Sequence, residues 1–254
     1  MQQAAKRLSD HKPAQAVPPA DGALKDLKKA LKEIEDRLAQ LREEERLDKL
    51  AKLEARFQEM LVRQQAATAS TTEVDKRRAG SETLRRADVI LLGKVATEEQ
   101  SLTEMASQAL ELIRDDGTSV VFPRVVQRMH GDLERVAKWL SNRDTGRLTQ
   151  STQVEIERTL EELIAALKEA QKTPKSGKPK QGKLGQPSED PLMPDNAELK
   201  LLRAAQERVN RLTREFDKQW LAKPLDEPGR EEIRRISQRQ QDISIMTEEM
   251  IKRK

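Results

Sequence analysis

A stripe of apolar residues at alternating spacings of three and four constrains this chain more than any other feature. We call it the leucine seam, and its members are Leu24, Leu27, Leu31, Ile34, Leu38 and Leu41. Side chains three and four positions apart share one face of an α-helix, and the intervening residues are mostly charged, Ala or Gln. The seam is a coiled-coil heptad pattern, which predicts a helix whose apolar face another helix must cover.

The composition predicts an all-α fold. Of the 254 residues, 35% are hydrophobic and 36% are charged, which does not favour a thick globular core. Aromatic residues make up 2% of the chain, fewer than pleated strands need. Helical bundles bury one stripe per helix and leave charged faces in water. We therefore expect an elongated antiparallel helical hairpin or bundle with coiled-coil segments, followed by a flexible linker and a C-terminal helical pair.

Prolines, glycines and composition shifts divide the chain into four parts. Residues 1–20 are expected to form a flexible N-terminal segment, and residues 173–194 a disordered linker rich in Lys, Pro and Gly. Residues 195–254 are expected to form the helical pair, which either docks back or binds a partner. Residues 21–172 are expected to form the long hairpin or bundle, with helices at about 21–78, 82–114, 119–142 and 152–172.

Capping residues set several of these boundaries. Gly117 is expected to end the second long helix. The expected N-caps are Asp21, Ser119, the Thr152–Glu155 capping box and the Asp195–Glu198 capping box. After Leu41 the heptad register slips, because Glu45 and Asp48 occupy the next seam positions. The apolar pattern then resumes at Leu47, Leu50, Phe57 and Leu61.

The basic excess of the chain is local. The formal net charge is +4, and five lysines stand in a stretch without acidic residues: Lys172, Lys175, Lys178, Lys180 and Lys183. Without them the basic and acidic residues nearly balance, which argues against specific nucleic-acid binding. The lysines are candidates for weak, salt-sensitive contact with a polyanion, and the alternative is a soluble tether.

No catalytic, cofactor-binding or metal-binding residues are expected. Residues 177–184 match the G-x-x-x-x-G-K pattern of a phosphate-binding loop, but Leu184 replaces the Ser or Thr that holds magnesium. The two histidines, His11 and His130, lie outside the E-x-x-H pairing of di-iron bundles. The chain has no cysteine, so it contains neither disulfides nor thiolate metal sites. We expect a protein that is not an enzyme.

The first twenty residues lack the continuous apolar region of a signal peptide, and no run of about 18 apolar residues occurs. We therefore expect a soluble protein without a transmembrane segment, cytoplasmic as written. A periplasmic or envelope location is the alternative if an export signal is missing from this chain.

Four segments carry a resemblance to a known family. They are residues 41–47 with 53–57, residues 115–117 followed by 121–123, residues 160–167, and residues 198–202 through 208–211. With these segments the chain resembles an uncharacterised family of helical coiled-coil proteins of planctomycete-type bacteria, over most of residues 20 to 250. The resemblance implies an envelope location, because the family's members carry an N-terminal export signal, which this chain lacks. It supplies no catalytic residues.

Two functional hypotheses follow. The first is a non-enzymatic structural or adaptor protein that presents helix faces, including the leucine seam, for self-association or for binding a protein partner. The alternative is a cell-envelope protein that binds anionic lipid or polymer through its basic linker.

Overall fold

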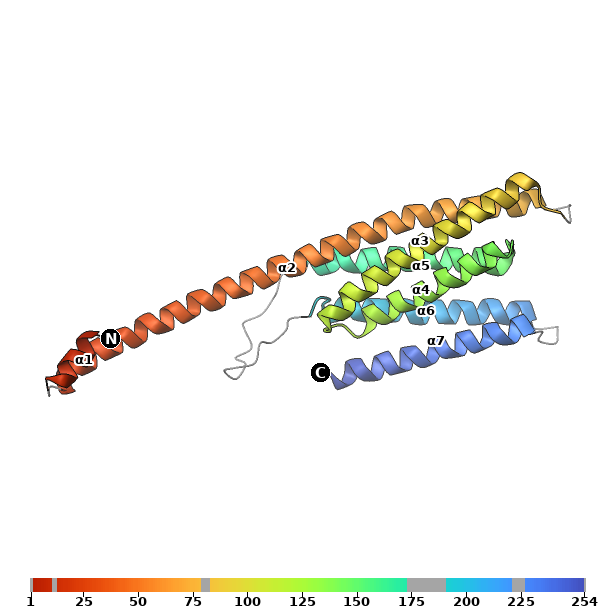
Figure 1. Ribbon diagram of the computed structural model, residues 1–254. Coiled ribbons are helices and arrows are strands. Elements are labelled where there is room, and N and C mark those ends of the chain that lie inside the picture. The colour runs from red at the N-terminus through yellow and green to blue at the C-terminus, as the bar shows by residue number, and fades with distance from the viewer. Residues whose placement is uncertain (1, 11–12, 79–82, 173–190, 221–226, 254) are drawn as a thin grey trace. The chain divides into compact units, whose positions relative to one another are not determined.

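The computed structural model describes residues 2–10, 13–78, 83–172, 191–220 and 227–253, and over these ranges the chain is all-α, which confirms the expected fold class (Figure 1). The helices are α1 (Gln2–Ser9), α2 (Pro13–Arg78), α3 (Arg86–Asp116), α4 (Val121–Ser141), α5 (Arg147–Lys172), α6 (Asp195–Trp220) and α7 (Glu227–Lys252). None of these described helices has an apolar stretch long enough to cross a bilayer.

The chain divides into two compact units, Met1–Lys49 and Leu50–Lys254. The first unit contains α1 and the N-terminal part of α2, including the leucine seam. The second unit contains the remainder of α2 with α3 to α7.

In the second unit the helices form a bundle in which successive helices run in opposite directions (Figure 1). Helix α4 packs against α3, α5 and α6, and α6 packs against α7. Side chains join α2 to its neighbours: the Arg63 guanidinium donates to Ser101 of α3 at 2.8 Å, and Gln171 of α5 donates to Glu54 at 2.7 Å. The C-terminal helical pair is therefore part of this bundle.

The bundle core is a continuous cluster of aliphatic side chains with few aromatic rings. Phe57 of α2 meets Phe122 of α4 edge to face, with 6.4 Å between ring centroids. From Leu50 onward the buried positions of α2 follow an unbroken three-four pattern: Leu50, Leu53, Phe57, Met60, Gln64, Ala67, Thr71 and Val74. Leu47 is exposed and Leu61 only half-buried, because both lie off this stripe, whereas Leu50 and Phe57 are buried as expected.

The N-terminal boundary differs from the expectation. Residues 1–20, expected to be a flexible segment, contain α1 and the start of α2. Helix α2 begins at Pro13, so Asp21 is not its N-cap and Pro18 and Pro19 lie inside the helix. Pro13 opens the helix, where a missing N–H donor costs little, whereas Pro18 and Pro19 lie beyond the first turn and each remove one hydrogen bond of the helix.

Helix α4 begins with a cap that comes from elsewhere in the chain. Its N-terminal N–H groups, on Val120 and Val121, donate to Glu198 Oε1 of α6 at 2.9 and 3.2 Å. The Ser119 hydroxyl, expected to cap this helix itself, also donates to Glu198. The Asp195–Glu198 capping box is therefore wrong, because the Glu198 carboxylate is used by α4 rather than by its own helix.

Helix α5 begins at Arg147 rather than at residue 152, so the Thr152–Glu155 capping box is also wrong. Thr152 lies inside the helix and its hydroxyl donates to the Leu148 carbonyl at 2.8 Å. The chain turns before α5 at Arg143, whose φ is 62°. Gly117, with φ 66°, ends α3 as expected.

The predicted linker falls mostly outside the described residues, which omit 173–190. Its last four residues are described and contradict the prediction. Leu192 and Met193 are fully buried in the bundle core, and the Leu192 N–H donates to the Thr118 hydroxyl at 2.9 Å. Two large apolar side chains after a polar stretch are enough to anchor the chain before α6 begins.

Replacing Glu198 tests the cap between helices. Glu198→Ala leaves the buried N–H groups at the start of α4 without an acceptor, and we expect a loss of about 2 kcal/mol in unfolding free energy. Urea denaturation measures it, with Glu207→Ala as the control because Glu207 lies exposed on the same helix. Equal losses for the two variants would contradict a capping role.

Candidate functional site

The leucine seam is exposed along its whole length. Its side chains retain between 45% (Leu41) and 59% (Ile34) of their accessible surface. Val17, one heptad before Leu24, is 55% exposed and extends the same face. Single exposed leucines are ordinary, but a row of six on one helix face is a contiguous apolar surface of the kind that other helices cover.

The five linker lysines stay a prediction. Lys172 is the last residue of α5 and is exposed. Lys175, Lys178, Lys180 and Lys183 lie outside the described residues.

A polar layer crosses the apolar core between α2, α3 and α5. Glu99 of α3 is fully buried, and its Oε1 accepts hydrogen bonds from Gln64 of α2 at 2.9 Å and Gln153 of α5 at 2.7 Å. Gln153 also donates to the Thr71 hydroxyl at 3.2 Å. Glu99 Oε2 and the side-chain oxygens of both glutamines are buried without a hydrogen-bond partner. A neutral carboxyl leaves no unpaired charge on the buried Oε2, so the layer suits a protonated Glu99.

Burial raises the pKa of Glu99 to about 7, against an ordinary value of 4.5. The two glutamine donors oppose this rise, and the negative charges of Glu98 and Glu157 add to it. Glu99 is thus a buried acid that changes charge near neutral pH.

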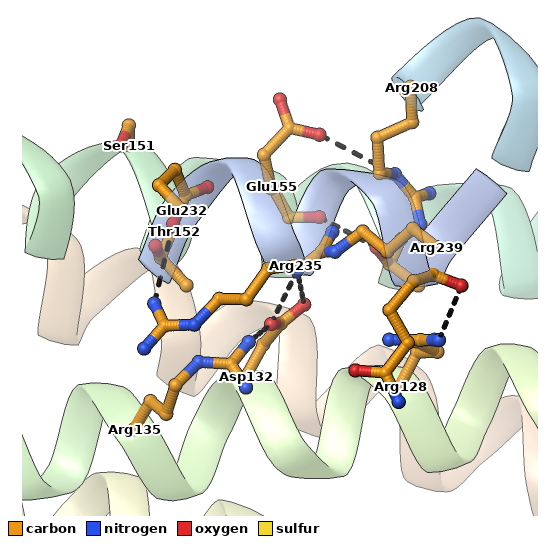
Figure 2. A network of polar contacts seen from close by, with 12 residues as sticks. Arg128, Asp132, Arg135, Ser151, Thr152, Glu155, Arg208, Glu232, Arg235 and Arg239 are labelled. Carbon is orange, nitrogen blue, oxygen red and sulfur yellow. Dashed lines mark hydrogen bonds and ion pairs between the residues drawn. The ribbon is translucent and has the colours of Figure 1, made fainter. Parts of the chain in front are cut away.

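A second polar network lies nearer the surface of the bundle, among α4, α5, α6 and α7 (Figure 2). Asp132 of α4 accepts two hydrogen bonds from Arg239 of α7, at 2.6 and 2.9 Å, and a third contact from Arg135 of its own helix. Arg128 pairs with Asp242, and Arg124 with Glu249 at 2.7 Å, so three guanidinium groups of α4 face α7.

Glu155 is the second carboxylate on which this network converges. It accepts from Arg158 of its own helix at 2.8 Å and from Arg211 of α6 at 2.8 Å. Arg208 of α6 approaches it within 3.4 Å and also pairs with Glu162. These charge-assisted contacts fix α6 against α5.

Like charges crowd the α4–α7 side of the network. Burial, together with the guanidinium groups of Arg235 and Arg239, lowers the pKa of Arg135 to about 10. Burial and Arg239 also lower the pKa of Arg128. Arg235 additionally stacks over the Trp139 ring, 5.6 Å from its centroid, which gives this cation an aromatic partner as well.

The residues of the two polar networks were not predicted as site residues. The sequence nevertheless indicates one carboxylate of each network by its position on an apolar helix face. Glu99 falls between Val95 and Leu102 on the buried stripe of α3, and Asp132 falls between Met129 and Val136 on that of α4. A carboxyl group buried on an apolar stripe either stays protonated, with a raised pKa, or ionises and pairs with a cation. Which of the two occurs depends on the residues that other helices place beside it.

The comparisons with known proteins add no homologue. No family model, no curated protein and no solved structure matches the chain. The resemblance to the planctomycete-type coiled-coil family therefore stays a prediction. Within the described ranges, no group of three His, Cys, Asp or Glu side chains is arranged to hold a metal ion.

Replacing Glu99 tests the buried acid. A carboxyl whose pKa is higher in the folded state stabilises the fold below its unfolded value of 4.5, and this contribution is lost as the pH rises through about 7. At about pH 8 Glu99→Gln should exceed the wild type by about 3 kcal/mol in unfolding free energy, and at about pH 4 the two should be nearly equal.

Urea denaturation at both pH values measures this difference, with Glu104→Gln, at an exposed position of the same helix, as the control. A stability difference between Glu99→Gln and the wild type that does not change with pH would show that the proton is not released near neutrality.

Proposed function

We propose that this protein is a non-enzymatic adaptor that self-associates through the leucine seam. The observation that carries this proposal is the exposure of six large apolar side chains on one face of α2. The Leu50–Lys254 unit has a closed apolar core of its own, to which the seam residues do not belong. The seam is thus left available to a second helix.

The energy available from the seam is comparable with the cost of association. Fully burying a leucine-sized side chain is worth about 1.5–3 kcal/mol, so covering the exposed half of six side chains on each of two helices releases on the order of 10 kcal/mol. Association itself costs roughly 4–15 kcal/mol. A second copy is therefore expected to bind with moderate affinity, so that monomer and oligomer exchange with concentration.

The charged flanks of the seam favour an antiparallel pair. In the heptad that places Leu24 at position a, Arg37 occupies position g and Arg42 the following position e. A parallel, in-register pair brings g of one helix beside the following e of the other, so these arginines would repel each other. An antiparallel pair brings e beside e and g beside g, which separates them.

Leu31→Asp tests the association. An aspartate in the middle of the seam places an unpaired charge in the interface, and we expect the full-length variant to sediment as a monomer at concentrations where the wild type associates. Gln40→Asp is the matched control, because it adds the same charge off the seam. Two results in analytical ultracentrifugation would overturn the proposal. One is a wild type that remains monomeric at every concentration, and the other is a Leu31→Asp variant that associates as strongly as the wild type.

Disulfide trapping tests the orientation, since the chain has no cysteine of its own. We expect Ala23→Cys and Glu44→Cys, both at position g, to form a mixed disulfide when the two variants are combined and oxidised. A rapid mixed disulfide between Ala23→Cys and Lys28→Cys, at position g and the following position e, would instead indicate a parallel pair. Each variant with Leu31→Asp added controls for random collision.

A further inference from the structure

The α4–α7 side of the bundle contains a groove lined by guanidinium groups. Arg124, Arg128 and Arg135 follow one face of α4 at spacings of four and seven, and Gln238 and Asp242 of α7 form the opposite wall. The hollow between them has a volume of about 360 Å³. Figure 2 shows the side chains of Arg128 and Arg135 extending from α4 toward α7. This groove belongs to the Leu50–Lys254 unit and is independent of the leucine seam.

The carboxylates that line the groove are already bonded. Asp132 accepts from both Arg239 and Arg135, and Asp242 pairs with Arg128. Arg135 uses Nη2 for Asp132, and within the described part of the chain its buried Nε has no hydrogen-bond partner. The groove therefore offers more donors than its own carboxylates occupy.

One side-chain amide adds a further donor. The Gln127 side-chain oxygen accepts from Arg114 at 3.1 Å, which leaves its NH₂ group to donate. Gln238 lies across the groove, where its backbone carbonyl accepts from Arg128 at 3.3 Å. Such donors, neutral and cationic together, suit an oxyanion with several lone pairs.

Gly131 keeps the groove open. It lies in the middle of α4, where glycine costs about 1 kcal/mol relative to alanine, and its backbone has no positive φ that would require glycine. The nearest atom to a Cβ at this position is Arg135 Nη1, at 3.9 Å. Helix packing does not require a glycine here, whereas a larger side chain would extend into the groove beside Arg135.

We propose that this groove binds a phosphate-type oxyanion, held by Arg128 and Arg135 with the Gln127 amide as a neutral donor. Guanidinium groups match phosphate oxygens in geometry as well as charge. Burial and, after it, repulsion from neighbouring guanidinium groups lower the pKa of Arg135, and a bound anion would relieve that repulsion. A free phosphate compound and a lipid headgroup present the same chemistry.

The experiment titrates the full-length protein with inorganic pyrophosphate by calorimetry at about 0.15 M salt, where long-range attraction is screened. A parallel arm measures co-sedimentation with vesicles of equal parts phosphatidylcholine and phosphatidic acid, against vesicles of phosphatidylcholine alone. Saturable binding of pyrophosphate identifies a free phosphate compound. Binding to the acidic vesicles without pyrophosphate binding identifies a lipid headgroup. Either result supports the site if the groove variants described next weaken the binding.

Two variants localise the binding. Arg135→Gln should weaken it at least about tenfold, because charged hydrogen bonds contribute about 1.5–3 kcal/mol, and Arg239 still neutralises Asp132 in this variant. Gly131→Glu places a carboxylate beside Arg135, so it should abolish binding while thermal denaturation shows a folded protein.

Arg203→Gln is the matched control, because it removes one exposed positive charge on α6, away from the groove. Binding that is absent in both arms would overturn the proposal. So would binding that Arg203→Gln weakens as much as Arg135→Gln, since that result would indicate general attraction to a basic protein.

Discussion

The narrow apolar stripe on each helix is the constraint on which the bundle depends. With so few aromatic residues, the chain fills its core mainly with Leu, Ile, Val, Met and Ala, and each helix of the Leu50–Lys254 unit is covered only where a neighbour lies along it. Parallel or antiparallel helices satisfy this requirement over their whole length, whereas crossing helices do so only at a point. Charged side chains beside the stripes are then brought close together, and their pairing becomes part of the packing.

The two internal polar networks show two physical solutions to a carboxylate on an apolar stripe. Glu99 is surrounded by neutral amides and by other acids, so its charge is suppressed and its pKa rises. Asp132 is surrounded by guanidinium groups, so its charge is matched, and burial and mutual repulsion lower the pKa of Arg135 instead. The first layer joins α3 to α2 and α5, and the second joins α4 to α7.

The exposed seam and the arginine-lined groove are different kinds of surface. The seam is apolar and repeats regularly, so it suits another helix, and its specificity depends on the charges at its flanks. The groove is polar, is formed by side chains of two helices and is open at a glycine, so it suits a small charged group. The proposed self-association and the proposed anion binding therefore use separate units of the chain.

Most of the secondary structure followed from local pattern. The seam, the three-four spacing of apolar residues and Gly117 identified the helices and one of their ends, because helix periodicity and a left-handed C-cap depend on neighbouring residues only. The heptad slip after Leu41 was likewise readable from Glu45 and Asp48.

Only the tertiary structure decided which residues act across helices. It assigned Glu198 to the N-terminus of α4 and buried Leu192 and Met193 at the end of a stretch that looks like a linker. It also gave Glu99 glutamines and Asp132 arginines as neighbours, and thereby opposite responses to burial. These outcomes depend on partners tens of residues away along the chain, whose positions are set by the packing of whole helices. The sequence by itself determined that the chain forms helices and where their apolar faces lie. Only the tertiary structure decided whether a buried carboxyl group is neutral or paired with a cation, because that depends on the side chains packed beside it.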